Sequence, residues 1–399
     1  MEYGARVNRD RFPGLADGWA RFDAPSGSQP VDSAIDAMAD FMRSGDVANQ
    51  GGAFRAGQRI DELMLEARRV AGSFVGGDPR GVVFGPSMTT LTLAFSAAVG
   101  RTLRPGDEIV CTRLDHDGNV RPWTLAAERA GATALFAEPD PETLELPTAA
   151  IEEVLSERTR WVAVTAASNC VGTAPDLAAV VAAAHTAGAR VYVDAVHAAP
   201  HRPLDAAGID CDAIVCSAYK WFGPHGSILW ARAELLEELQ PDKLRVSTNE
   251  VPWKWETGTP AFEALAGLMA AVDYMHELGY DTIRAHEEAL FARLLEGIRS
   301  IEGVVVHGAA RDRAPTLYFS VEGRTPHEVA SALAEHQVSV SHGNNYALEL
   351  SEFLGLEPDG GIRAGIVHYN DDEDVDRLLE ALERAAQPSL SRTSRHSSS

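Results

Sequence analysis

The chain has 399 residues, which is long enough for a large domain and a smaller one. Its formal net charge of -23 argues against nucleic acid or an anionic membrane as a partner, because both attract basic surfaces. Residues 1–10 hold no apolar run and no stretch approaches a membrane span, so we expect neither a signal peptide nor a membrane segment. The four cysteines show no CxxC spacing, which is typical of buried thiols in a reducing cytoplasm, where we place this protein.

The first part of the chain predicts an arm, a turn and two helices. Residues 1–20 are expected to form an arm, and residues 22–28 (FDAPSGS) have turn chemistry. Helices are predicted over residues 32–43 and from about residue 58 to 74. The glycine-rich loop between them, residues 49–54, fits neither GxGxxG nor a Walker loop, so it does not indicate nucleotide binding.

A strand, a small-residue turn and a helix follow, and together they indicate an anion site. The strand is predicted at residues 82–84 and the helix at residues 91–99. The N–H groups of a first helical turn lack intrahelical partners, and the hydroxyls of Thr89 and Thr90 add donors there. The two threonines would equally serve as simple helix caps.

The next buried strands each end in a polar residue. Residues 108–111 lead to His116, and residues 161–164 lead to Asn169. A histidine in a loop is most often only solvated. At the carboxyl end of a strand, however, His116 would be placed to stack on a bound ring.

The segment 191–223 contains two further buried strands with polar ends. Residues 191–193 deliver Asp194, and residues 213–216 deliver Ser217, Tyr219 and Lys220. Ligands of open α/β sheets bind outside the carboxyl ends of the strands, so both runs aim at one crevice.

Asp194 and Lys220 at neighbouring strand ends are what a pyridoxal phosphate site requires. The lysine amine bonds the cofactor aldehyde, and the carboxylate keeps the pyridine nitrogen protonated. Taken alone, the aspartate would be a helix cap and the lysine a solvated side chain. The Ser-x-x-Lys spacing also occurs in penicillin-binding enzymes, but their partner motifs are missing here.

Strands alternate with helices from about residue 80 to 230, which predicts an α/β fold with a mainly parallel, doubly wound sheet. We expect a large domain over residues 21–262, a smaller α+β domain over 263–386, and a disordered tail over 387–399. In the smaller domain the sequence predicts strands at 315–321, 338–341 and 363–370, and helices at 326–336 and 372–385, after a helix at 262–277. His197 and His201 have helical zinc spacing, but Pro200 between them argues against a metal site, and we predict none.

With these residues located, the chain resembles the class V, fold-type I pyridoxal-phosphate enzymes of the cysteine desulfurase and isopenicillin N epimerase kind, which include carbon–sulfur lyases. The resemblance covers roughly residues 10–385. It is strongest in the motifs FDAPSGSQ, FGPSMTTLT, TRLDHDGNVRPW, ASNCVGT, VDAVHAAPH, SAYKWFGP, ETGTP and RAGIVHYN.

The resemblance implies roles for the residues around the cofactor. Lys220 would form the Schiff base and shuttle protons, Asp194 would pair with the pyridine nitrogen, and His116 would stack on the ring. Asn169 and His197 would hydrogen-bond the oxygen side of the ring. The phosphate would be held by Thr89, Thr90, Ser217 and Tyr219.

The resemblance also implies a homodimer and an amino-acid substrate. Thr259 would reach the phosphate of the neighbouring subunit, and Arg363 would bind the substrate α-carboxylate. The expected lining of the substrate site consists of polar and aromatic residues, namely Arg55, His342, Asn344, Asn345 and Tyr346.

Two positions depart from the desulfurase pattern. Tyr219 stands where the better-known desulfurases have His. The loop that carries their reactive cysteine corresponds to residues 341–347 (SHGNNYA), and no cysteine follows Cys216. We therefore expect a carbon–sulfur β-lyase that cleaves a cysteine S-conjugate to a thiol, pyruvate and ammonia. Amino transfer, epimerisation and decarboxylation-coupled oxidative deamination stay open, as does a non-catalytic binding protein of the same fold.

Overall fold

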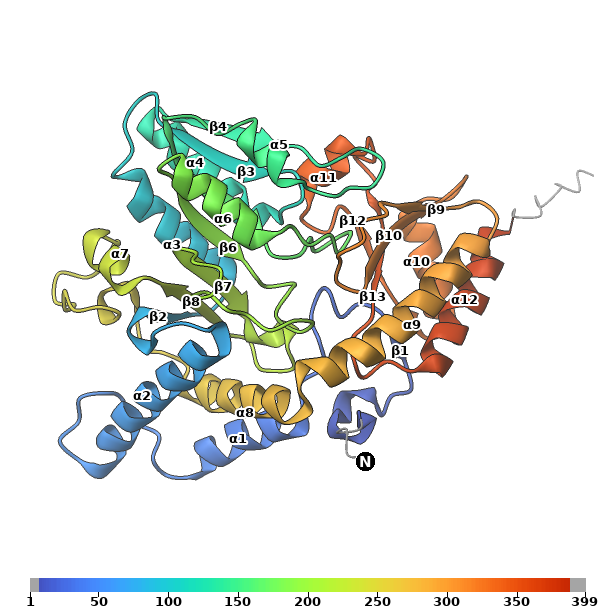
Figure 1. Cartoon of the computed structure of the whole chain (residues 1–399). Helices are drawn as coiled ribbons and strands as arrows, with labels where there is room; N and C mark the ends of the chain where they lie inside the picture. Colours follow the sequence, from blue (N-terminus) through green and yellow to red (C-terminus); the bar gives the residue numbers. More distant parts are fainter. Residues whose placement is uncertain (1–6, 388–399) are drawn as a thin grey trace, which may run out of the picture.

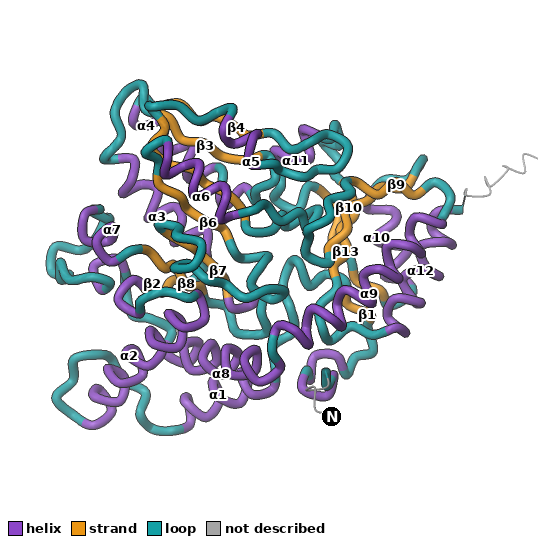
Figure 2. The backbone as a smooth tube through the Cα atoms, viewed as in Figure 1, coloured by secondary structure: helices purple, strands orange, loops and turns teal. Residues whose placement is uncertain are grey.

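A computed structural model describes residues 7–387 of the chain. Residues 1–6 of the predicted arm lie outside the described residues, and so does the predicted disordered tail apart from Gln387. Figure 2 shows the strands gathered into two separate groups, each flanked by helices.

The larger group is a seven-stranded sheet with the strand order β2-β8-β7-β6-β5-β3-β4. Its strands are β2 (Val82–Gly85), β3 (Glu108–Thr112), β4 (Thr133–Ala137), β5 (Thr159–Thr165), β6 (Arg190–Asp194), β7 (Ala213–Ser217) and β8 (Ser227–Ala231). Neighbours from β4 to β7 pair in parallel, whereas β8 runs antiparallel to both β7 and β2. The predicted α/β class with a mainly parallel sheet is confirmed.

Helices cover both faces of this sheet (Figure 1), which is why its strands are short apolar runs rather than alternating ones. Every residue of β3, β7 and β8 is buried. The helices of this part of the chain are α1 (Asp32–Arg43), α2 (Arg55–Val75), α3 (Met88–Gly100), α4 (Arg121–Ala130), α5 (Thr148–Glu152), α6 (Leu177–Thr186), α7 (Ala233–Glu238) and α8 (Phe262–Leu278). One face packs on an aromatic cluster of Phe95, Trp123, Trp161 and Tyr192.

The second group is a four-stranded antiparallel sheet with the order β12-β13-β10-β9. Its strands are β9 (Val304–His307), β10 (Thr316–Val321), β12 (Ser341–Gly343) and β13 (Gly361–Gly365). The helices of this region are α9 (Tyr280–Ser300), α10 (Pro326–Glu335), α11 (Leu348–Phe353) and α12 (Asp372–Ala386). The two long helices on either side of Gly279 have different packing partners. α8 packs on α1 and α2, whereas α9 packs on α12 and β9. The predicted domain bounds themselves stay a prediction.

Two predicted strands of this region differ from the structure. The run at 338–341 is split into β11 (Val338–Ser339), which pairs in parallel with β1 (Ala20–Arg21), and β12. The predicted strand at 363–370 was wrong in position, because β13 ends at Gly365 and Arg363 lies at the centre of that strand instead of its start. Asn370 explains the early end: its side-chain oxygen accepts from Val367 N at 3.0 Å, which bends the chain into a turn.

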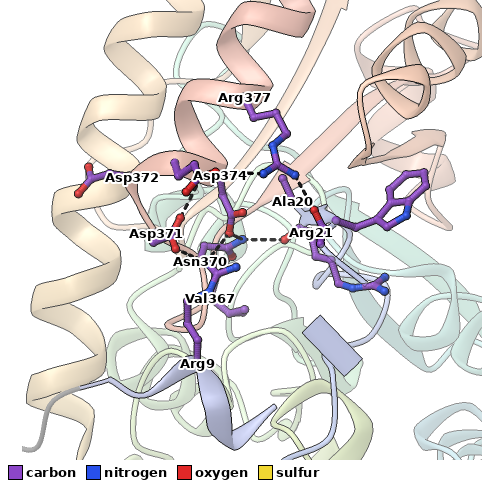
Figure 3. A network of polar contacts seen from close by, with 12 residues as sticks. Arg9, Ala20, Arg21, Val367, Asn370, Asp371, Asp372, Asp374 and Arg377 are labelled. Atoms are coloured by element: carbon purple, nitrogen blue, oxygen red, sulfur yellow. Dashed lines mark hydrogen bonds and ion pairs between the residues drawn. The ribbon is translucent and has the colours of Figure 1, made fainter. Parts of the chain in front are cut away.

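The N-terminal segment is fastened to the C-terminal helix by a polar network (Figure 3). Arg9 pairs with Asp371 at 2.6 Å and with Asp374 at 2.8 Å. Asn370 donates to the backbone oxygen of Arg21 at 2.9 Å. These contacts place the following turn, residues 22–28, between the two sheets, and its Asp23 bridges to Gly365 of β13.

Within residues 7–387 no helix combines the length and the apolar character needed to cross a membrane. Over the same residues no three His, Cys, Asp or Glu side chains gather where a metal ion could be held.

Candidate active site

The predicted lysine and aspartate meet at the carboxyl edge of the large sheet. Asp194 is the last residue of β6, and Lys220 ends the 3₁₀ turn that follows β7, its parallel neighbour. Both line an inner cavity of about 50 Å³. An outer cavity of about 500 Å³ adjoins it and shares the lining residues Pro25, His116, Asn169, Tyr219 and Lys220.

Lys220 has the properties of a nucleophilic amine. Burial lowers its pKa to about 7, with a further lowering from the charge of Arg363, and Asp194 opposes the shift. A lysine with this pKa is about half uncharged at pH 7, and the uncharged amine can bond an aldehyde. Its Nζ donates to the backbone oxygen of Pro25, which fixes the amine at the mouth of the inner cavity.

Asp194 is a buried carboxylate placed opposite this amine. Burial raises its pKa to about 6, against the hydrogen bond from Val196 N (2.9 Å to Oδ1) and the charge of Lys220. The carboxylate therefore gains from any further cation in the inner cavity, and a protonated pyridine nitrogen is such a cation.

His116 presents a neutral imidazole to the same cavity. Its Nδ1 accepts from Gly118 N at 2.8 Å, so the single ring proton lies on Nε2. Burial first, then the charges of Lys220 and Arg363, lower its pKa to about 3. The ring of Tyr346 stacks on it with centroids 5.3 Å apart and planes 19° apart. A Cβ added to Gly118 would lie 3.0 Å from His116 Nδ1, so a side chain there would displace the imidazole.

Asn169 and His197 supply polar atoms to the wall of the inner cavity. Asn169 Nδ2 donates to the backbone oxygen of Asn345 at 2.8 Å, while its Oδ1 is buried and has no hydrogen-bond partner in the described part of the chain. His197 Nε2 lies 2.9 Å from Thr316 Oγ1, and burial lowers its pKa well below the usual value. An unpartnered buried oxygen favours a ligand that brings a donor.

Arg363 is a buried cation without an anion. Only 4% of the residue is exposed, and burial lowers its pKa. Nη1 donates to the backbone oxygen of Asn169 at 2.9 Å and Nη2 donates to Ser26 Oγ at 2.6 Å, while Nε has no partner. Among residues 7–387 no carboxylate pairs with it. A guanidinium desolvated in this way is stabilised by a carboxylate that enters from the outer cavity.

The predicted phosphate residues are only partly brought together. Thr89, in the first turn of α3, and Tyr219 line the inner cavity. Thr90 instead bonds Ser87 Oγ, the N-cap, at 2.8 Å. Ser217 Oγ is turned into the sheet, 2.7 Å from Ser227 Oγ. Thr259 is exposed on this chain's surface. The roles of these residues stay predictions.

The predicted substrate lining is also only partly assembled. Strand β12 brings His342 to the outer cavity, and the loop between β12 and α11 brings Asn344, Asn345 and Tyr346 there. Arg55 is not there: it is exposed at the start of α2 and pairs with Asp46 at 2.9 Å.

The loop is held over the site by its backbone. The oxygen of Tyr346 accepts from Asp117 N at 2.6 Å, and that of Gly343 accepts from Tyr318 OH at 2.9 Å. Asn345 and Tyr346 both adopt left-handed φ values, 53° and 59°. Such residues cost about 1–3 kcal/mol each and persist where surrounding contacts impose them, typically at functional sites.

Sequence reasoning missed Pro25 and Ser26 as site residues. Pro25 accepts from Lys220, and Ser26 Oγ contacts both Arg363 and Ser341 Oγ (2.7 Å). The only signal was the Pro-Ser-Gly turn itself, whose residue types suit any exposed turn.

These features together define a fold-type I pyridoxal-phosphate enzyme. They are the mixed sheet, a buried lysine with a lowered pKa, an aspartate on the neighbouring strand, a neutral histidine and a buried arginine. The residues fit the cofactor, since within residues 7–387 Asn169 Oδ1 accepts from no donor and Asp194 forms no ion pair in the cavity where the ring would lie. The cofactor is pyridoxal phosphate.

Comparisons with known proteins agree with this class. The family model "Aminotransferase class-V" matches residues 21–378, so the chain belongs to the class V aminotransferase family. An uncharacterized protein of Mycobacterium tuberculosis is 32% identical, covering 96% of this chain and 99% of its own length. A cysteine desulfurase of Klebsiella pneumoniae is 31% identical, with coverages of 91% and 92%. The solved apo cysteine desulfurase of Thermococcus onnurineus has a TM-score of 0.90 at 26% identity, covering 97% and 99%.

Proposed function

We propose that this enzyme is a carbon–sulfur β-lyase that cleaves a cysteine S-conjugate into a thiol, pyruvate and ammonia. The observation that carries the α-amino acid substrate is Arg363, a buried guanidinium with no carboxylate partner in the described part of the chain, at the wall that the outer cavity shares with Lys220. A bidentate carboxylate there would place the substrate's Cα near the lysine amine.

The state of the cysteines supports elimination over sulfur transfer. A desulfurase requires a thiolate that attacks the substrate sulfur. All four cysteines of this chain, which are Cys111, Cys170, Cys211 and Cys216, are buried, and the sequence holds no others. None of the four lines the outer cavity. Cys170 is the nearest to the site, and burial raises its pKa to about 11, which suppresses its thiolate.

The residues of the site suit elimination. Pyridoxal phosphate, when bound, withdraws electrons from Cα of the substrate. Lys220, with its pKa near 7, can accept the α-proton and return it. The Cβ–S bond breaks, the sulfur leaves with its electron pair as a thiolate, and addition of water to the remaining fragment releases pyruvate and ammonia. Ser26 and Asn169 hold the Arg363 guanidinium in place for the carboxylate.

The working unit is proposed to be a homodimer in which Thr259 reaches the phosphate of the neighbouring site. The exposure of Thr259 in a single chain is consistent with that role. A cytoplasmic location stays a prediction.

The test is a product survey by mass spectrometry of the holoenzyme with cysteine S-conjugates and with other amino acids. We expect a free thiol and stoichiometric pyruvate from an S-conjugate, and no product from Lys220→Ala. A keto acid that retains the carbon–sulfur bond would indicate amino transfer or oxidative deamination, and an inverted amino acid would indicate epimerisation. Protein-bound persulfide formed from free cysteine would refute the lyase proposal.

A further inference from the structure

A second cavity, of about 660 Å³, lies apart from the lysine site and shares no lining residue with its two cavities. It is formed by one side of α9, labelled in Figure 1, the segment 309–315, and His201 with Arg202 from the loop after β6. Five arginines line it, in a chain whose net charge is -23. We call it the arginine cavity.

Two of the three acidic residues that line the arginine cavity already have a partner. Asp312 pairs with Arg202 at 3.0 Å. Glu287 Oε2 lies 2.8 Å from His201 Nδ1. Glu288 is the lining carboxylate that has no ion pair within residues 7–387.

Three of the arginines are not neutralised. Arg299, Arg311 and Arg313 pair with no carboxylate among the described residues, although most arginines of this acidic chain do pair. Arginines that converge on one concave surface without counter-ions repel one another, and an anion bound between them removes that cost.

Arg313 lies deepest of the three. Its Nη2 donates to the backbone oxygens of Val171 (2.7 Å) and Thr316 (2.6 Å), and its Nε is buried without a partner. Burial, with a further lowering from Arg299, lowers its pKa to about 10. Phe291 lies under the guanidinium, 5.1 Å from the ring centroid, and fixes its plane.

We propose that the arginine cavity is a binding site for a small polyanion that carries at least two phosphate or carboxylate groups. Arg299, Arg311 and Arg313 would bind these groups, because the unpaired Glu288 offsets only one of their three positive charges and two remain. Planar guanidinium forks suit both kinds of oxyanion, so the shared chemistry is a multiply charged oxyanion.

The proposed site is linked to the wall of the cofactor pocket through the loop at residues 169–172. Arg313 bonds Val171, in the loop of Asn169, and the backbone of that loop is joined to the cavity wall by Ala314 N to Gly172 O at 2.8 Å. The ring of His201 also packs edge-on against His197, with centroids 5.5 Å apart. The proposal does not depend on which reaction the enzyme catalyses.

The test is calorimetric titration of the holoenzyme with inorganic pyrophosphate and, separately, with tricarballylate at constant ionic strength. The bound cofactor keeps the added anion from its phosphate site. We expect saturable one-to-one binding of at least one probe, weakened at least about tenfold in Arg299→Gln/Arg311→Gln. Both positions are exposed, so this variant should fold, unlike the deeper Arg313→Gln.

Two matched variants complete the test. Arg324→Gln removes another arginine that has no ion pair within residues 7–387 and does not line the cavity, and it should bind the probe like the wild type. Arg363→Gln removes the cation of the substrate site and should also bind normally. Absence of saturable binding for both probes, equal affinity in the double variant, or loss of binding only in Arg363→Gln would overturn the proposal.

Discussion

Replacing Arg363 by glutamine tests the proposed carboxylate site most directly. Glutamine keeps a donor near Asn169 O and Ser26 Oγ, which accept from the guanidinium at 2.9 and 2.6 Å, but it removes the positive charge. A buried, charge-assisted pair of hydrogen bonds contributes about 2–4 kcal/mol to binding. The loss corresponds to roughly 30- to 900-fold in substrate affinity.

Stability should respond differently from affinity. Arg363 is buried without a counter-ion in the described chain, so its charge costs desolvation free energy in the unliganded protein. Glutamine removes that cost, and the melting temperature of Arg363→Gln should equal or exceed that of the wild type.

The assay is steady-state kinetics of thiol release, with thermal unfolding measured on the same preparations. We expect a large rise in KM with the cofactor's visible absorbance unchanged, while Arg324→Gln behaves as the wild type. An unchanged KM, or a fall in melting temperature that accounts for the lost activity, would show that Arg363 is a structural residue instead.

Other predictions concern the lysine, the pH and the loop. Lys220→Ala should lose the visible absorbance band and the covalent adduct that borohydride traps in the wild type, while its circular dichroism stays native; a retained adduct would exclude Lys220 as the cofactor's anchor. Because only the uncharged amine reacts and its pKa is about 7, the rate of reconstitution of the apoenzyme with pyridoxal phosphate should fall about tenfold per pH unit below pH 7 and level off above it. Stopped-flow absorbance measures this rate. A break near the ordinary lysine pKa of 10.5 would contradict the prediction. Tyr346→Ala should lose the ring stacking on His116, which contributes about 0.5–1.5 kcal/mol, and should raise KM up to about tenfold. Tyr346→Phe keeps the ring and should leave KM unchanged. Equal effects of both substitutions would assign the role to the hydroxyl.

The part of the site that could be predicted from sequence is the part built by parallel strands. Asp194, Lys220, His116 and Asn169 follow β6, β7, β3 and β5, and parallel strands bring their carboxyl ends to one edge. Their convergence therefore needs only the strand assignment and the direction of the strands. Strand β8 was not predicted from the sequence; it returns antiparallel to β7 after the short 3₁₀ turn that carries Lys220.

What sequence could not predict depends on contacts between distant segments. Ser26 reaches Arg363 because Asp23 bridges to Gly365, and no local periodicity encodes that pairing. The position of Arg363 within β13 was missed because the following residues, Ile366 to Tyr369, have the composition of a strand. A single side-chain oxygen, that of Asn370, turns the chain there instead.

In the proposed lyase, the loop at residues 341–347 would carry the groups that favour elimination over sulfur transfer. Its backbone oxygens accept from Asp117 N, Tyr318 OH and Asn169 Nδ2, and these contacts do not depend on the side chains that the loop carries. Two side chains of the loop also shape its path, because Asn345 Nδ2 donates to Gly343 O at 3.0 Å and Asn344 Oδ1 accepts from Tyr346 N at 3.1 Å. In this chain it presents Tyr346 to His116 and His342 to the outer cavity. Groups of that kind can bind the substituent on a substrate sulfur, but neither can accept the sulfur as a persulfide, because that requires a thiolate.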